Sequence, residues 1–145
     1  MLSITLPLPP SANRIWRVAR GRIHRSVEYL DWIETATRII RDDGIEPNAV
    51  SGRYWLSLAI PFGDRADADN RLKATSDLLV KLKLVPDDRY MDAAYVRRVQ
   101  SITSGLCRVT AAAISEPRAA APGGRRPEVP PVLSLLAGGM EAAPS

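Results

Sequence analysis

A group of acidic residues with one lysine lies near the middle of this 145-residue chain, and their types suit metal chemistry. The group comprises Asp67, Asp69 and Lys73, followed further on by the pair Asp87-Asp88. In an extended segment, Asp67 and Asp69 would point to the same side, with Cα atoms about 6–7 Å apart. Hard divalent cations prefer carboxylate oxygens and water as ligands. In a basic protein, this set is typical of a metal-dependent nuclease.

The same residues could instead have a purely structural role, without metal binding or catalysis. Asp69-Asn70 is typical of an N-cap that opens a helix and carries Lys73 one turn in. On spacing alone, a loop carboxylate followed by such a cap is the better account, and it stabilises by roughly 1 kcal/mol. Lys73 also lies four residues from Asp77, where a surface ion pair contributes a few tenths of a kcal/mol.

Composition narrows the kinds of site that the chain can build. The chain has one cysteine and one histidine, which excludes an internal disulfide and disfavours zinc, so carboxylates must form any metal site. No apolar run approaches the roughly 20 residues that span a bilayer, and the N-terminus lacks the pattern of a signal peptide. We therefore expect a cytoplasmic protein without a membrane segment. The net charge of +4 favours a polyanionic partner.

Basic residues gather near the N-terminus of the chain. Five arginines lie within twelve residues: Arg14, Arg17, Arg20, Arg22 and Arg25. Because planar guanidinium groups bind two phosphate oxygens at once, these residues are candidates for contacts with the DNA backbone. A solvated loop is the alternative. Trp16 lies among them, and it could stack on an unpaired base or fill a core or edge position.

Two helices with apolar stripes are predicted. The first is capped by Ser26 and runs to about Asp42. Its expected inner face is Val27, Leu30, Ile33, Thr37 and Ile40. The second runs from about residue 70 to 83, and its expected inner face is Leu72, Thr75, Leu78, Leu79 and Leu82. Because this helix leads away from Asp69, the strand after it must return Asp88 if three carboxylates are to meet; either Asp87 or Asp88 could then face the metal.

Alternating apolar residues predict strands around these helices. Residues 2–6 and 54–60 are expected to be strands, and residues 95–102 and 106–114 to form a hairpin that turns at 103–105. From residue 117 onward Pro, Ala and Gly dominate, which predicts a disordered tail. The expected organisation is one α+β domain over residues 1–116 and a tail over residues 117–145.

Together these motifs resemble the RusA-type Holliday junction resolvases, small phage- and prophage-associated endodeoxyribonucleases. The resemblance covers roughly residues 2–114. Residues 3–14 are similar to the family's opening strand and Pro-Pro-Ser-x-Asn loop, and residues 20–24 to its basic turn. Residues 67–73 and 87–88 are similar to the family's Asp-x-Asp-Asn-x-x-Lys motif and downstream Asp-Asp. Residues 63–66 depart from the strongly basic runs of some members, and this bears on DNA binding and strand preference more than on metal-dependent cleavage.

The resemblance implies a compact mixed sheet packed by two helices, and a homodimer whose two sites each nick one of two opposed strands of a four-way junction, in DNA recombination and repair. It implies that Asp67, Asp69 and Asp88 bind Mg²⁺, with Mn²⁺ as a substitute, and that Lys73 assists. Residues expected to support the site are Asn13, Asn70 and Asp87. The alternatives are a less selective nuclease acting on flaps or forks, a non-catalytic DNA-binding module and a protein-interaction adaptor.

Overall fold

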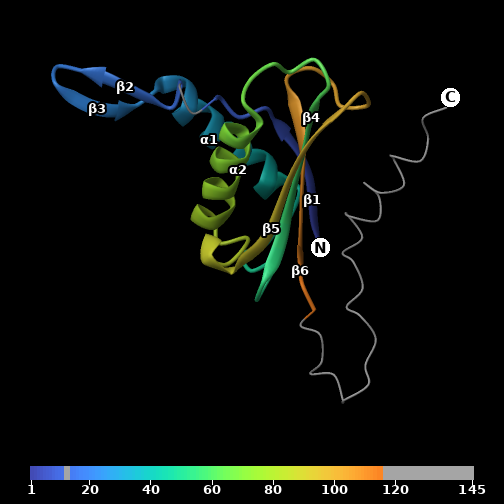
Figure 1. Ribbon diagram of the computed structural model, residues 1–145. Helices are drawn as coiled ribbons and strands as arrows, with labels where there is room; N and C mark the ends of the chain where they lie inside the picture. The colour runs from blue at the N-terminus through green and yellow to red at the C-terminus, as the bar shows by residue number, and fades with distance from the viewer. Residues whose placement is uncertain (12–13, 116–145) are drawn as a thin grey trace, which may run out of the picture. The chain divides into compact units, whose positions relative to one another are not determined.

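A mixed four-stranded sheet in the order β1-β6-β4-β5 forms the centre of the fold (Figure 1). The computed structural model describes residues 1–11 and 14–115. The sheet consists of β1 (Leu2–Pro7), β4 (Tyr54–Pro61), β5 (Met91–Val99) and β6 (Leu106–Ala113). The helices are α1 (Val27–Asp42) and α2 (Ala68–Lys81), and a short 3-10 turn, η2 (Asp88–Tyr90), precedes β5. A separate hairpin is formed by β2 (Trp16–Ala19) and β3 (Arg22–Arg25). The predicted α+β class is confirmed.

One hydrophobic core lies between the two helices and one face of the sheet. Along β1, Leu2, Ile4 and Leu6 are buried while Ser3 and Thr5 are exposed, as the alternation predicts. Every residue of β4 is buried, because this strand lies between β5 and β6. The strand that leads to the acidic residues is therefore the most enclosed one in the sheet.

The order of the strands contradicts the predicted hairpin of residues 95–102 and 106–114. Strand β6 is antiparallel to β1 and β4, whereas β5 pairs in parallel with β4. Strand β4 therefore separates the two expected partners, and residues 100–105 carry the chain across its end. Parallel neighbours need a crossover, and α2 provides it between β4 and β5. Alternation along a strand shows which side chains are buried, but it does not identify the neighbouring strand.

The predicted inner face of α1 is also wrong in part. Ser26 caps the helix as expected, and its hydroxyl accepts from the Tyr29 N–H at 3.1 Å. However, Val27 is 73% exposed and Leu30 is 48% exposed. The buried stripe is Tyr29, Trp32, Ala36 and Ile40. The indole of Trp32 donates to the Pro7 carbonyl at 2.9 Å, which turns the aromatic side of the helix toward the end of β1.

In α2, the predicted burial of Thr75, Leu78 and Leu79 is confirmed, whereas Leu72 and Leu82 are only half-buried. The helix also begins and ends about two residues earlier than expected. No helix among the described residues is long and apolar enough to cross a membrane. The predicted tail, residues 117–145, lies outside the described part of the chain.

The arginine-rich segment forms a hairpin, which corrects the alternative of a solvated loop. Trp16 pairs with Arg25 and Ala19 with Arg22, so that Arg20 and Gly21 form the turn. Both turn residues have positive φ, 52° and 72°. That combination is typical of a two-residue type I′ turn, whose twist matches that of the flanking strands. The Arg20-Gly21 pair was the signal for this hairpin in the sequence.

Candidate functional site

The two aspartates of the central motif lie at the start of α2, but their roles differ from the expectation. The residue that caps the helix is Asp67, not Asp69: its Oδ1 accepts from the Asp69 N–H at 3.2 Å. The Asn70 side-chain amide donates to Asp67 Oδ2 at 3.4 Å. Asp69 lies in the first turn of the helix. Both carboxylates therefore stand at the positive end of the helix dipole, which stabilises negative charge.

Lys73 lies one turn beyond Asp69 on the same face of α2, where side chains four residues apart are neighbours. Its Nζ forms an ion pair with Asp77 Oδ2 at 3.7 Å, and the two side chains are 71% and 51% exposed. The predicted surface ion pair is thus confirmed. Within residues 1–11 and 14–115, no hydrogen bond or ion pair engages the side chain of Asp69. The start of α2 presents two carboxylates and one ammonium group to solvent.

A largely buried ion pair anchors the loop that precedes α2. Arg71 Nη2 lies 3.2 Å from Asp64 Oδ1, and the two side chains are only 13% and 11% exposed. Arg71 also donates to the carbonyl of Pro9, in the segment that follows β1. This pair joins the loop, the helix and the N-terminal segment. Sequence analysis missed it, because neither residue belongs to a local pattern that predicts burial.

A second arginine holds the same loop from the sheet. Arg98, near the end of β5, donates through Nε to the Asp64 carbonyl at 2.9 Å and through Nη2 to the Ala66 carbonyl at 3.1 Å. Ala66 directly precedes Asp67. The loop that leads to Asp67 is therefore held by two hydrogen bonds from the Arg98 guanidinium on β5 and by the ion pair between Arg71 and Asp64.

Asp88 lies at the opposite end of the crossover. It begins η2, which leads directly into β5, and the first residue of β5 pairs with Tyr54 at the start of β4. Burial, and then the charges of Asp88 and Asp87, raise the pKa of Tyr54, which places both aspartates near this end of β4. Asp67 instead follows the other end of β4, and the 14-residue α2 between them spans about 20 Å.

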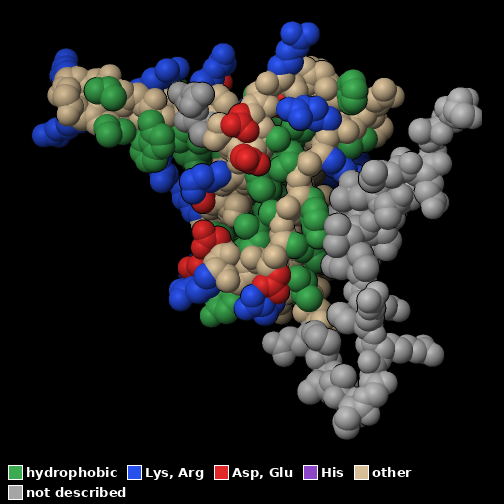
Figure 2. All heavy atoms as spheres, in the orientation of Figure 1, with side chains coloured by type: hydrophobic (Ala, Val, Ile, Leu, Met, Phe, Trp, Pro, Cys, Tyr) green, Lys and Arg blue, Asp and Glu red, His purple; other side chains and the backbone are tan. Residues whose placement is uncertain are grey.

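The strand after α2 therefore does not return Asp88 to the other aspartates of the same chain. Figure 2 shows acidic side chains near both ends of α2. Among the described residues, no group of three Asp, Glu, His or Cys side chains could hold a metal ion. One chain brings Asp67, Asp69 and Lys73 together, and it keeps Asp88 apart.

Asp87 and Asp88 have different surroundings. Asp87 caps η2: its Oδ1 accepts from the Arg89 N–H at 3.1 Å and lies 3.3 Å from Arg89 Nε. The hydrogen bond from the Arg89 backbone, with smaller effects of Asp88 and the Arg89 side chain, lowers the pKa of Asp87. Asp88 is exposed in the turn that follows. Asp87 thus serves the local structure, and Asp88 is the better placed of the two to meet another molecule.

The predicted DNA-binding arginines lie on or next to the β2–β3 hairpin. Arg14 forms an exposed ion pair of 3.8 Å with Glu28. The Arg25 guanidinium lies over the rings of Trp16 and Tyr29, at 5.9 and 5.6 Å from their centroids. Arg17, Arg20 and Arg22 are exposed. Trp16 is 54% exposed, which excludes the core position. Asn13 lies outside the described residues.

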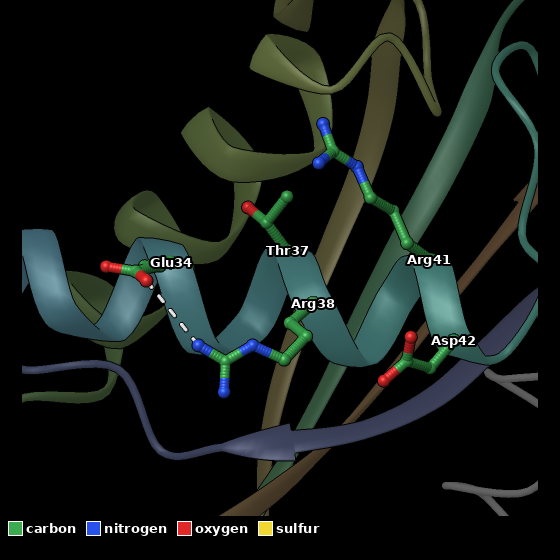
Figure 3. A pocket seen from close by; sticks show the side chains of 5 residues that line it. All are labelled: Glu34, Thr37, Arg38, Arg41 and Asp42. Carbon is green, nitrogen blue, oxygen red and sulfur yellow. Dashed lines mark hydrogen bonds and ion pairs between the residues drawn. The ribbon is translucent and has the colours of Figure 1, made fainter.

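Two hollows lie on the described surface outside the start of α2. Figure 3 shows one on the outer side of α1, lined by Glu34, Thr37, Arg38, Arg41 and Asp42. Its Glu34–Arg38 contact of 3.4 Å is an ordinary surface ion pair between exposed side chains. The other hollow is lined by Phe62, Asp64, Gln100 and Ser104, among others. It adjoins the loop before α2, and therefore belongs to the same end of the sheet as Asp67.

Comparisons with known proteins point to one family. No protein family model matches the chain. The chain is 39% identical over 87 residues to the crossover junction endodeoxyribonuclease RusA of Shigella sonnei strain Ss046, which covers 59% of this chain and 72% of that protein. It is 38% identical to RusA of Escherichia coli strain K12 over the same shares. It is 37% identical over 86 residues to the crossover junction endodeoxyribonuclease of Enterobacteria phage 82, again over 59% and 72% of the two chains.

Proposed function

The chain belongs to the RusA family of crossover junction endodeoxyribonucleases, and on this premise we propose that it resolves four-way DNA junctions by paired nicks. The observation that carries the proposal is the start of α2. There Asp67 and Asp69 are exposed on a braced backbone, and Lys73 stands one turn away on the same face. Carboxylates beside a cation suit hydrolysis of a phosphodiester, because the reaction develops negative charge on the phosphate.

We propose that Asp67 and Asp69 hold Mg²⁺, for which Mn²⁺ can substitute. Their donors fit this ion, because carboxylate oxygens are hard ligands. The hydrogen bonds to Asp67, of 3.2 and 3.4 Å, are long and leave lone pairs on both oxygens. When bound, such an ion supplies an activated water molecule and stabilises charge on the scissile phosphate. Lys73 would offset further charge on that phosphate.

The position of Asp88 supports a homodimer. Because α2, about 20 Å long, separates Asp88 from Asp67 in one chain, Asp88 would join Asp67 only from a second copy. We propose that Asp88 of the partner subunit completes each site. A two-fold symmetric dimer then forms two identical sites. A four-way junction also has two-fold symmetry, so the two sites can act on two opposed strands.

The basic hairpin would hold the substrate. Arg17, Arg20 and Arg22 are exposed and can each bind phosphate oxygens, so the affinity for DNA should fall steeply with salt. Resolution of four-way junctions would place the protein in DNA recombination and repair. The relative in Enterobacteria phage 82 is consistent with a prophage origin.

A cleavage assay tests the proposal. Wild-type protein in Mg²⁺ should nick a synthetic four-way junction on two opposed strands, and EDTA should stop the reaction. Asp69→Asn should bind the junction as tightly as wild type and cut it at least about a hundredfold more slowly, because a catalytic metal contributes several kcal/mol. Undiminished cutting by this variant would refute the site.

The substrates of the same assay separate the alternatives. Equal cutting of forks, flaps and four-way junctions would identify a less selective nuclease. DNA binding that is indifferent to EDTA, without cleavage under any metal, would identify a non-catalytic DNA-binding module. Failure to bind any DNA structure at low salt would favour a protein-interaction adaptor.

A further inference from the structure

The β2–β3 hairpin has two chemically different faces. Side chains alternate along each strand, and residues that are directly paired across an antiparallel ladder share a face. The pairs Trp16–Arg25 and Val18–Ile23 therefore lie on one face. The pairs Arg17–His24 and Ala19–Arg22 lie on the other. We call the first the apolar face of the hairpin.

The apolar face is unusually exposed for large hydrophobic side chains. Trp16, Val18 and Ile23 are 54%, 76% and 69% exposed. The hairpin forms its own two-stranded sheet among the described residues and projects away from the main sheet (Figure 1). Figure 2 shows hydrophobic and basic side chains side by side on it. An isolated hairpin is marginally stable in water, and an exposed apolar group of this kind indicates a contact surface.

Charge indicates what covers the apolar face. Between residues 14 and 25 the chain has five arginines and no acidic residue. Arg25 lies within the apolar face itself, with its guanidinium 5.9 Å from the Trp16 ring centroid. A symmetric contact between the hairpins of two copies would bring ten arginines together, and like charges repel. A polyanion that also exposes flat apolar surfaces matches both properties.

A four-way junction offers such a surface at its centre. In continuous duplex DNA, neighbouring base pairs cover one another by stacking. At an open branch point, the last base pair of each arm can lose its neighbour and expose its flat face. Apolar side chains can insert between base pairs, and aromatic rings stack on unpaired bases.

We propose that the apolar face of the hairpin, Trp16 with Val18 and Ile23, inserts at the branch point and covers the unstacked base pairs. Arg17 and Arg22, on the opposite face, bind the flanking phosphates. The inference rests on the proposed function and deepens it, because it assigns selection of a four-way junction over a duplex to this hairpin. The acidic site at α2 then cuts whichever strand the hairpin has positioned.

Binding measurements in EDTA test this inference without cleavage. The variants are Trp16→Ala and the double substitution Val18→Thr with Ile23→Thr, which keeps β-branched side chains in both strands. Val27→Thr is the matched control, because Val27 is 73% exposed on α1 and lies outside the hairpin. Each variant is titrated with a four-way junction and with a linear duplex of the same sequence.

Both hairpin variants should bind the junction at least about fivefold more weakly, which corresponds to the loss of one stacked base, while duplex binding changes by less than about twofold. The control should bind both as wild type does. In wild type, 2-aminopurine at the branch point should change its fluorescence on binding, and Trp16→Ala should reduce that change.

Three results would overturn the inference. Equal weakening on junction and duplex would show that the hairpin contacts ordinary duplex DNA. Unchanged binding by both variants would remove the hairpin from recognition. Conversion to a monomer in light scattering, together with weaker binding, would show that the apolar face is a contact between copies. Failure of the wild type to cut any junction would instead refute the proposed function, and it would leave this binding contrast intact.

Discussion

Acidic residues lie at both ends of α2, but they make different contacts with the rest of the structure. At the N-terminal end, Asp67 caps the helix, and the loop before it is held by Arg71 and Arg98. At the C-terminal end, Asp87 caps the short η2 turn and contacts the exposed side chain of Arg89. The first end is braced by arginine side chains from α2 and β5. At the second, the Asp87 carboxylate contacts its sequence neighbour Arg89, and backbone hydrogen bonds from Asn48 and Val50 hold the chain before it. We infer that the braced end holds the pre-organised part of the site.

The distance between these ends follows from the topology. In a parallel β4–α2–β5 unit, the helix starts after the C-terminal end of the first strand, and the second strand starts at the other end of the pair. Three carboxylates that look like one motif in the sequence therefore divide into two groups in the fold. If Asp67, Asp69 and Asp88 all act on one metal ion, Asp88 has to come from a second copy of the chain.

The largest expected effect contrasts the two adjacent aspartates of the far end. Asp88→Asn should slow junction cutting at least about a hundredfold, as Asp69→Asn does, because both are proposed to hold the same ion. Asp87→Asn should stay within about threefold of wild type, because Asp87 serves only the η2 turn. Single-turnover cutting of a four-way junction measures both rates. A reversed order would assign the metal to Asp87.

A smaller effect is expected for the lysine near the braced end. Lys73→Ala should slow cutting by about 10- to 100-fold with little change in junction affinity, because its charge acts on the transition state. Asp77→Asn is the matched control: it removes the ion-pair partner but keeps the ammonium group, and it should change the rate by less than about twofold. Equal and small effects of both substitutions would reduce Lys73 to a surface ion pair.

The smallest effect concerns the brace from β5. Arg98→Ala removes two hydrogen bonds to the loop before Asp67, and should raise the Mg²⁺ concentration for half-maximal cutting about three- to tenfold. Arg97→Ala is the control, since it removes the same charge from an adjacent, exposed position. The readout is a Mg²⁺ titration at saturating junction. Equal shifts for both variants would indicate a general effect of charge on DNA binding instead of positioning of Asp67.

Much of the fold could be predicted from local patterns. The alternation of Leu2, Ile4 and Leu6 located β1, the Ser26 cap located the start of α1, and the enclosed run of β4 was found within one residue. The pairing of β5 could not be predicted, because a strand pattern does not specify its neighbour. The buried face of α1 could not be predicted in full, because it carries Tyr29 and Trp32, and the hydrogen bond from Trp32 to Pro7 joins residues 25 positions apart.

The candidate site was predictable in residue types but not in arrangement. Asp67 and Asp69 are both good N-cap residues, so the local sequence did not decide between them. The brace formed by Asp64, Arg71 and Arg98 joins distant segments, and no local motif identifies it. The separation of Asp88 depends on the parallel crossover, which only the strand order reveals.

The most direct test of the account uses dimers of two different subunits. Asp69→Asn and Asp88→Asn chains carrying different tags are co-expressed, and mixed dimers are isolated through both tags. If each site combines Asp69 of one chain with Asp88 of the other, one site of the mixed dimer contains both substitutions and the other contains neither. The account predicts that the mixed dimer nicks a four-way junction on one strand, whereas each single-variant dimer is inactive. A mixed dimer that binds the junction but makes no nick would contradict it.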